Sequence, residues 1–132
     1  MYPLNHNSVL QAYKKTQMSA MSTKQMEVMA FRRATSMLKQ ASENVRDYES
    51  YTAALKFNQR LWTAIQAGLT GDNHRVPEPV RTKLLNLSLF VDNQTLTALT
   101  QPKAEHLSAL IDINISITDG LAEQGRAAPI QL

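Results

Sequence analysis

The chain has 132 residues, of which 43% are hydrophobic and 19% are charged, and this is typical of one globular domain with a single core. It contains no cysteine, which excludes disulfides, thiolate metal sites and cysteine nucleophiles. The net charge of +3 is uneven, with nine Lys/Arg against four Asp/Glu in residues 1–66, but no run exceeds two basic residues, so a nucleic-acid patch is not indicated.

Apolar residues at helical spacing predict five helices, the first of them short. Their expected ranges are about 8–16, 22–45, 49–67, 78–101 and 104–122. The second begins at Ser22, because the S-x-x-Q spacing to Gln25 is typical of a capping box. After the third helix, Gly68 or Gly71 offers a left-handed stop.

Prolines mark the limits of the fourth helix. Pro77 and Pro79 fit its first turn, where proline is tolerated, and Pro102 interrupts it. Residues 112–118 alternate with period two, but helix-period residues on both sides of them favour helix.

These elements predict an all-α architecture, a single-domain bundle of four main helices plus a short N-terminal helix. The domain covers residues 1–132, and its ends, 1–7 and 123–132, are expected to fray. No internal repeat or low-complexity tract divides the chain.

The fourth helix is apolar most of the way round. One stripe contains Val80, Leu84, Leu87 and Val91, whereas other faces carry Leu85, Leu89, Phe90 and Leu96. Such a helix is either the central helix of a bundle or one that presents a face to a partner.

Two of the predicted helices place an asparagine within an apolar stripe. Asn58 lies among Tyr51, Leu55, Trp62, Ile65 and Leu69, and Asn114 among Leu110, Ile111 and Ile117. An unpaired buried amide costs roughly 1–3 kcal/mol, so each amide needs partners. In one interpretation the two amides bond each other or a group on a neighbouring helix, and this fixes the packing register. In the other, one of them faces a groove and bonds the backbone of a partner.

Trp62 also has two interpretations. On its apolar stripe it is expected to anchor the core, with its indole N–H bonded to a carbonyl. The alternative is an interface hot spot.

Five of the six methionines fall within residues 18–37: Met18, Met21, Met26, Met29 and Met37. Flexible methionines recur on surfaces that accept helices, and the interleaved basic residues Lys24, Arg32, Arg33 and Lys39 would suit an acidic amphipathic helix. The alternative is that Met26 and Met37 fill the core and the basic residues form a solvated face.

Arg60 falls off the stripe of its helix and is a candidate exposed contact. The candidate partner-binding residues are therefore Met18, Met21, Met26, Met29, Arg32, Arg33 and Arg60.

The sequence gives little support to catalysis. His6, His74 and His106 lie in a tail, a loop and a helix start without ligand spacing, and each is expected to be a solvated surface residue. Asp112 and Asp119 are two turns apart, too far to act as a close pair. With four glycines there is no phosphate-binding loop. We expect a protein that is not an enzyme and has no metal or cofactor.

No segment predicts export or membrane insertion. The first eight residues lack the charged segment and apolar run of a secretory signal, and the most apolar stretch, 84–91, is too short to span a bilayer. We expect a soluble cytoplasmic protein.

Three stretches resemble signature motifs of the FlaF family, flagellar biosynthesis regulators of alphaproteobacteria. They are "FNQRLW" (57–62), "VPEPVRTKLLNLSLFV" (76–91) and "LIDINISITDGL" (110–121). The family pattern maps onto Asn58, Leu61, Trp62, Asn73, Pro77, residues 88–91, Ile111, Ile113, Asn114, Ile117, Gly120 and Leu121. The resemblance covers roughly residues 8–122, with Val76 standing where leucine is expected.

The resemblance implies a role in flagellin production and export, together with flagellin and an FlbT-type post-transcriptional regulator. The leading hypothesis is a cytoplasmic flagellin-binding chaperone or checkpoint that uses the methionine-rich, basic segment. The alternative is a direct RNA-binding regulator of flagellin synthesis that uses the basic first half. Scattered charges and no evident aromatic platform make direct nucleic-acid binding the weaker alternative.

Overall fold

The computed structural model describes residues 8–9, 23–70 and 76–127, which form four long helices. In chain order these are α2 (Thr23–Glu43), α3 (Tyr48–Thr70), α4 (Glu78–Thr100) and α5 (Ala104–Ala127). The described part contains no strand, and residues 112–118 are helical, so the all-α prediction is confirmed. Ser8 and Val9 are helical, whereas the rest of the predicted short helix lies outside the described residues.

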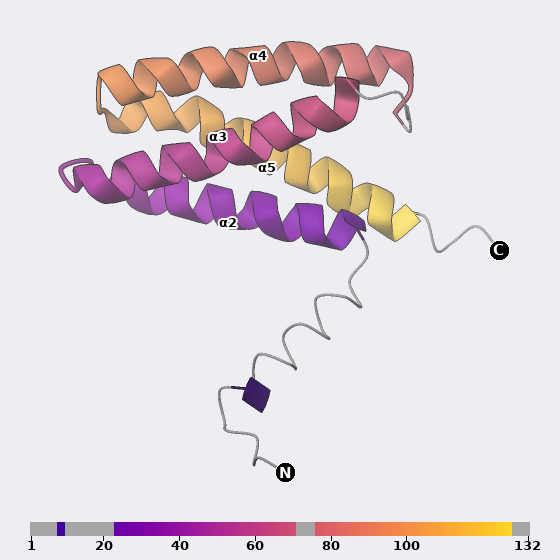
Figure 1. Cartoon of the computed structure of the whole chain (residues 1–132), viewed down its shortest axis with the longest axis horizontal. Coiled ribbons are helices and arrows are strands. Elements are labelled where there is room, and N and C mark those ends of the chain that lie inside the picture. Colours follow the sequence, from indigo (N-terminus) through magenta and orange to yellow (C-terminus); the bar gives the residue numbers. More distant parts are fainter. Residues whose placement is uncertain (1–7, 10–22, 71–75, 128–132) are drawn as a thin grey trace.

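The four helices form a bundle in which consecutive helices are neighbours. α2 packs against α3 and α5, and α4 packs against the same two helices. Figure 1 shows α3 and α5 running obliquely between α2 and α4, which lie at opposite edges of the bundle. Short connections between long helices favour this alternating arrangement.

A side-chain cap and a pair of prolines explain where two helices begin. Asp47 caps α3: its carboxylate accepts the backbone N–H of Ser50 at 3.2 Å and the Ser50 hydroxyl at 2.7 Å. Pro77 precedes α4 and Pro79 lies in its first turn, as predicted.

Two helix ends differ from expectation. α3 continues through Gly68 to Thr70, and no described glycine has a positive φ, so Gly68 does not act as the stop. α5 extends to Ala127, past the predicted end at 122 and into the segment expected to fray.

The core is built mainly from α2, α3 and α5. Trp62 is fully buried and meets Phe31 edge to face, with ring centroids 5.7 Å apart. The other buried core residues include Leu38, Ala41, Tyr51, Ala54, Leu55, Val91, Ala98, Leu107 and Leu110.

The two asparagines meet inside the bundle. Asn114 Nδ2 donates to Asn58 Oδ1 at 2.7 Å, and both side chains are fully buried. The indole N–H of Trp62 donates to Asn114 Oδ1 at 3.0 Å. Of the predicted alternatives, the structure shows amides that bond each other, together with a tryptophan whose N–H is bonded in the core. The amides thereby join α3 to α5 and tie the register of the two helices.

α4 is not a central helix, which corrects one of the two interpretations of its apolar sequence. Its buried residues are small or carry hydroxyls: Ser88, Val91, Thr95 and Ala98. Leu87 and Leu99 are partly buried and pack against the core, whereas Leu89 and Leu96 point outward and are 58% and 61% exposed. In a bundle of four helices every helix keeps one outer face. The apolar outer face of α4 therefore has no partner within the described chain. None of the described helices is both long and apolar enough to cross a membrane.

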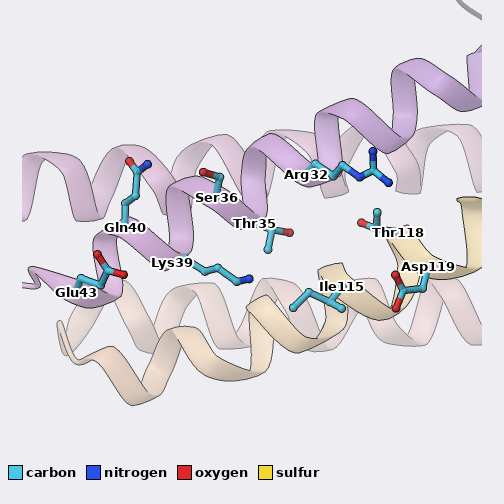
Figure 2. A pocket seen from close by; sticks show the side chains of 9 residues that line it. All are labelled: Arg32, Thr35, Ser36, Lys39, Gln40, Glu43, Ile115, Thr118 and Asp119. Atoms are coloured by element: carbon cyan, nitrogen blue, oxygen red, sulfur yellow. The ribbon is translucent and has the colours of Figure 1, made fainter.

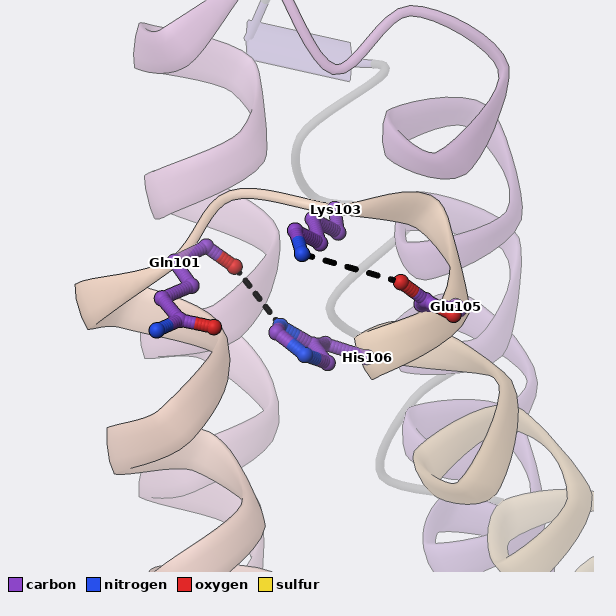
Figure 3. Close-up of polar contacts among 4 residues, drawn as sticks. All are labelled: Gln101, Lys103, Glu105 and His106. Atoms are coloured by element: carbon purple, nitrogen blue, oxygen red, sulfur yellow. Dashed lines mark hydrogen bonds and ion pairs between the residues drawn. The ribbon is translucent and has the colours of Figure 1, made fainter.

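The turn from α4 to α5 is held by polar contacts (Figure 3). The His106 ring Nδ1 lies 2.7 Å from the Gln101 carbonyl, and because a carbonyl only accepts, Nδ1 carries the proton. Gln94 of α4 donates to the His106 carbonyl at 2.8 Å. Lys103 and Glu105 form an exposed ion pair at 4.0 Å.

Candidate protein-binding surfaces

Two of the candidate methionines are exposed on α2. Met26 is 45% exposed and Met29 is 52% exposed, so the interpretation of Met26 as a core filler is wrong. Met37 is partly buried and packs against the core, in agreement with its interpretation as a core filler. Met18 and Met21 lie outside the described residues.

Arg33 connects the exposed part of α2 to α3. Its guanidinium carbon lies 5.3 Å from the centre of the Phe57 ring, a cation–π geometry. Phe57 is itself only partly buried. The contact therefore lies at the surface, at the seam between the two helices.

The register of α2 and α3 brings four of the predicted residues together, namely Met26, Met29, Arg33 and Arg60. The helices are consecutive and antiparallel, and Arg33 lies level with Phe57. Met29 is one turn before Arg33, and Arg60 is about one turn after Phe57, so both lie in the same direction along the seam. Met26 follows one turn further. We call Met26, Met29, Arg33, Phe57 and Arg60 the α2–α3 surface.

Arg32 and Lys39 lie on another side of α2, away from the α2–α3 surface. They line a groove between α2 and α5 with a volume of about 410 Å³. Figure 2 shows side chains from both helices around this groove, which also includes Thr35, Ser36, Gln40, Glu43, Ile115, Thr118 and Asp119. Arg32 is thus separated from Arg33, its neighbour in sequence, because adjacent helix positions point about 100° apart.

The groove carries both signs of charge and one exposed apolar residue. Arg32 and Lys39 are balanced by Glu43 and Asp119, while Ile115 is 37% exposed. Of its lining residues, the sequence predicts only Arg32 and Lys39 as part of a candidate contact surface. Ile115, Thr118 and Asp119 carry no local signal, because they become lining residues only when α5 packs beside α2.

The cations of the α2–α3 surface have no acidic partner in the described part of the chain, where Lys103–Glu105 is the ion pair observed. Arg60 is exposed on α3, and Arg33 contacts a ring instead of a carboxylate. Apolar side chains and unneutralised cations therefore share this surface, which suits an apolar helix bearing acidic residues.

Among the described residues, Asp47 and Tyr51 have a shifted pKa, and both stabilise helix ends. Hydrogen bonds from Ser50 lower the pKa of Asp47. Burial raises the pKa of Tyr51, whose hydroxyl donates to the Ala98 carbonyl at 2.7 Å. Neither residue belongs to the α2–α3 surface or to the groove.

Among the described residues, no group of three His, Asp or Glu side chains could hold a metal ion. His106 is partly exposed, and its ring Nδ1 is bonded to the Gln101 carbonyl. His6 and His74 lie outside the described residues.

Comparison with protein families matches residues 9–121 to the family described as "Flagellar protein FlaF". No curated protein matches the chain, and no solved structure matches it. The family match spans all four long helices except the end of α5.

Proposed function

Because the chain belongs to the FlaF family of flagellar proteins, we propose that it binds flagellin in the cytoplasm, as a chaperone or checkpoint of flagellin synthesis and export. The proposed role is binding without catalysis, and the candidate site is the α2–α3 surface. An FlbT-type regulator is a further candidate partner.

The observation that carries this proposal is the exposure of Met26 and Met29 beside Arg33 and Arg60. Methionine adapts its shape at little cost, so it suits a surface that accepts an apolar helix. The two arginines would select acidic residues on that helix and orient it. A chaperone needs such a surface, because unassembled subunits expose the apolar faces that later become buried.

The test is binding of purified flagellin to the full chain, measured by calorimetry. Met26→Glu with Met29→Glu should weaken binding at least about tenfold, because two buried carboxylates would oppose an apolar contact. Helicity and the unfolding midpoint should stay unchanged, since both positions are exposed.

The matched control is Leu89→Glu with Leu96→Glu, which also changes two exposed apolar residues of one helix. This variant should bind flagellin like the natural chain. Loss of binding in the leucine variant alone would move the site to α4. Absence of binding by the natural chain would refute the proposed function.

The direct RNA-binding alternative is tested in the same way with the flagellin transcript. It requires binding that weakens steeply with salt. Phe57, the aromatic residue of the α2–α3 surface, lies beneath Arg33 and is only partly exposed, which makes it a poor stacking platform.

A further inference from the structure

α4 carries an exposed apolar face at the edge of the bundle opposite α2. Leu89 and Leu96 are more exposed than any other large apolar residue described, at 58% and 61%, and Phe90 beside them is 46% exposed. Side chains of this size rarely stay in water at neighbouring positions of one helix unless they meet a partner.

The exposed residues follow the seam of a coiled coil. Leu89 and Leu96 are seven residues apart, and Asn86 and Asn93 repeat the same spacing three residues before each leucine. Alternating steps of three and four keep all four on one side of the helix. This side is opposite the buried Ser88, Val91 and Thr95.

The same face has almost no charge. Between Lys83 and Lys103 the only charged residue is Asp92, and its carboxylate accepts a hydrogen bond from Gln66 of α3 at 3.0 Å. A charged helix would therefore find no complementary group here. The face matches best a surface that is itself apolar and uncharged.

We propose that this α4 face, formed by Asn86, Leu89, Phe90, Asn93 and Leu96, binds the same face of a second copy of the chain. The pattern is self-complementary, because Leu89 and Leu96 lie on either side of Asn93 at nearly equal distances along the helix. In an antiparallel pair of α4 helices, a two-fold axis near Asn93 sets Leu89 of one copy against Leu96 of the other.

Asn93 then has a defined role in the dimer. Its amide is exposed in the single chain, and at the two-fold axis it lies beside the same amide of the second copy. Two facing asparagines can each donate and accept one hydrogen bond. A polar pair among leucines favours one alignment, as asparagines do in coiled coils.

The proposal goes beyond flagellin binding, because α4 lies at the other edge of the bundle from α2 and the two surfaces share no residue (Figure 1). The dimer would therefore leave both copies of the α2–α3 surface free. Two flagellin-binding surfaces would then be carried by one particle.

The first experiment is sedimentation of the full chain over concentrations up to about 200 μM, a range that detects weak association. A monomer–dimer equilibrium is expected. Leu89→Glu with Leu96→Glu should raise the dissociation constant at least about tenfold, because it sets carboxylates of the two copies against each other on both sides of the axis. Met26→Glu with Met29→Glu is the control and should dimerise like the natural chain.

The second experiment uses the absence of native cysteine. Asn93→Cys creates a single thiol near the proposed axis, and mild oxidation should link two copies through it. Ala53→Cys is the control, because Ala53 is exposed on α3 and lies outside the proposed face, and it should remain unlinked. Two Cα atoms must come within about 7 Å for such a bond to form.

Each result decides the proposal. A chain that stays monomeric throughout overturns it, and so does a dimer that resists the leucine substitutions or links equally well through Ala53→Cys. A monomeric chain whose leucine variant loses flagellin binding would show that flagellin, and no second copy, covers α4. Dimerisation without flagellin binding would support this inference while refuting the proposed function.

Discussion

The side chains of Asn58 and Asn114 bond each other at 2.7 Å within the core, and Asn114 also accepts the Trp62 indole N–H at 3.0 Å. The arrangement is unequal. Asn114 uses both its amide oxygen and its amide nitrogen, whereas Asn58 Nδ2 has no partner among the described residues. The two amides therefore contribute differently to stability, although they form one bond.

Replacement of each asparagine by alanine tests this inequality. Asn114→Ala leaves Trp62 Nε1 and Asn58 Oδ1 unpaired, and should lower the free energy of unfolding by about 3–4 kcal/mol. Asn58→Ala leaves only Asn114 Nδ2 unpaired and removes a donor that has no partner, so a loss of about 1–2 kcal/mol is expected. Urea unfolding measures both values, and equal losses would contradict the unequal arrangement.

Tyr51 is expected to stabilise the end of α4. Its hydroxyl donates to the Ala98 carbonyl at 2.7 Å, and that carbonyl has no helical donor because residue 102 is proline, which lacks an N–H. Tyr51→Phe should lower the free energy of unfolding by about 1–2 kcal/mol, since it leaves a buried carbonyl unpaired. Leu55→Ile, a volume-conserving change in the same helix, is the control for general repacking.

Tyr51 also predicts a loss of stability at high pH. Burial raises the pKa of its phenol above the ordinary value of 10.0, against a smaller opposing effect of the Lys103 backbone. The folded state therefore keeps the proton longer than the unfolded state. Its stabilising contribution is complete below pH 10 and is lost as the pH rises through the folded-state pKa. The unfolding midpoint of Tyr51→Phe should fall less between pH 9 and pH 12 than that of the natural chain, measured at about equal salt.

The shifted pKa of Asp47 predicts a loss of stability at low pH. Hydrogen bonds from Ser50 lower its pKa below the ordinary value of 3.8, so its contribution is present above that pH and is lost as the pH falls through the folded-state pKa. Asp47→Ala should lower the unfolding midpoint at neutral pH and have less effect in acid. Asp47→Asn keeps a capping oxygen and should be milder. A difference between Asp47→Ala and the natural chain that does not change with pH would contradict this account.

Arg32 and Arg33 separate the two surfaces of α2. Arg33→Glu should weaken flagellin binding about tenfold at low salt and less at high salt, because Arg33 belongs to the α2–α3 surface. Arg32→Glu makes the same change of charge one residue away but faces the groove with α5, so binding should stay near that of the natural chain. Equal effects of the two substitutions would point to general attraction by net charge.

The sequence predicted the helices well because their signals are local. The spacing around Trp62 and Asn114 repeats over several turns, and the structure shows both residues inside the core. The cost of an unpaired buried amide predicted that each asparagine needs a partner, and the structure shows that the two bond each other. The FlaF resemblance rested on three ordered motifs and is confirmed by the family match.

Features that depend on packing between helices were harder to predict. The apolar sequence of α4 fitted a central helix equally well, and only its neighbours show that Leu89 and Leu96 point outward. Met26 could not be distinguished from Met37 by composition, because both are methionines of one predicted helix and only Met37 is covered by the core. The groove required α5 beside α2, a contact between residues far apart in sequence.

The hydroxyl-rich inner side of α4 has a consequence for local unfolding of the bundle. Ser88 and Thr95 bring little apolar area to the core, and α4 is joined to α3 in part by hydrogen bonds from Gln66 and Tyr51. Detaching α4 would expose less apolar area than detaching any helix that carries Trp62 or Leu110. Local opening should therefore begin at α4, and its amide protons should exchange faster than those around the asparagine pair.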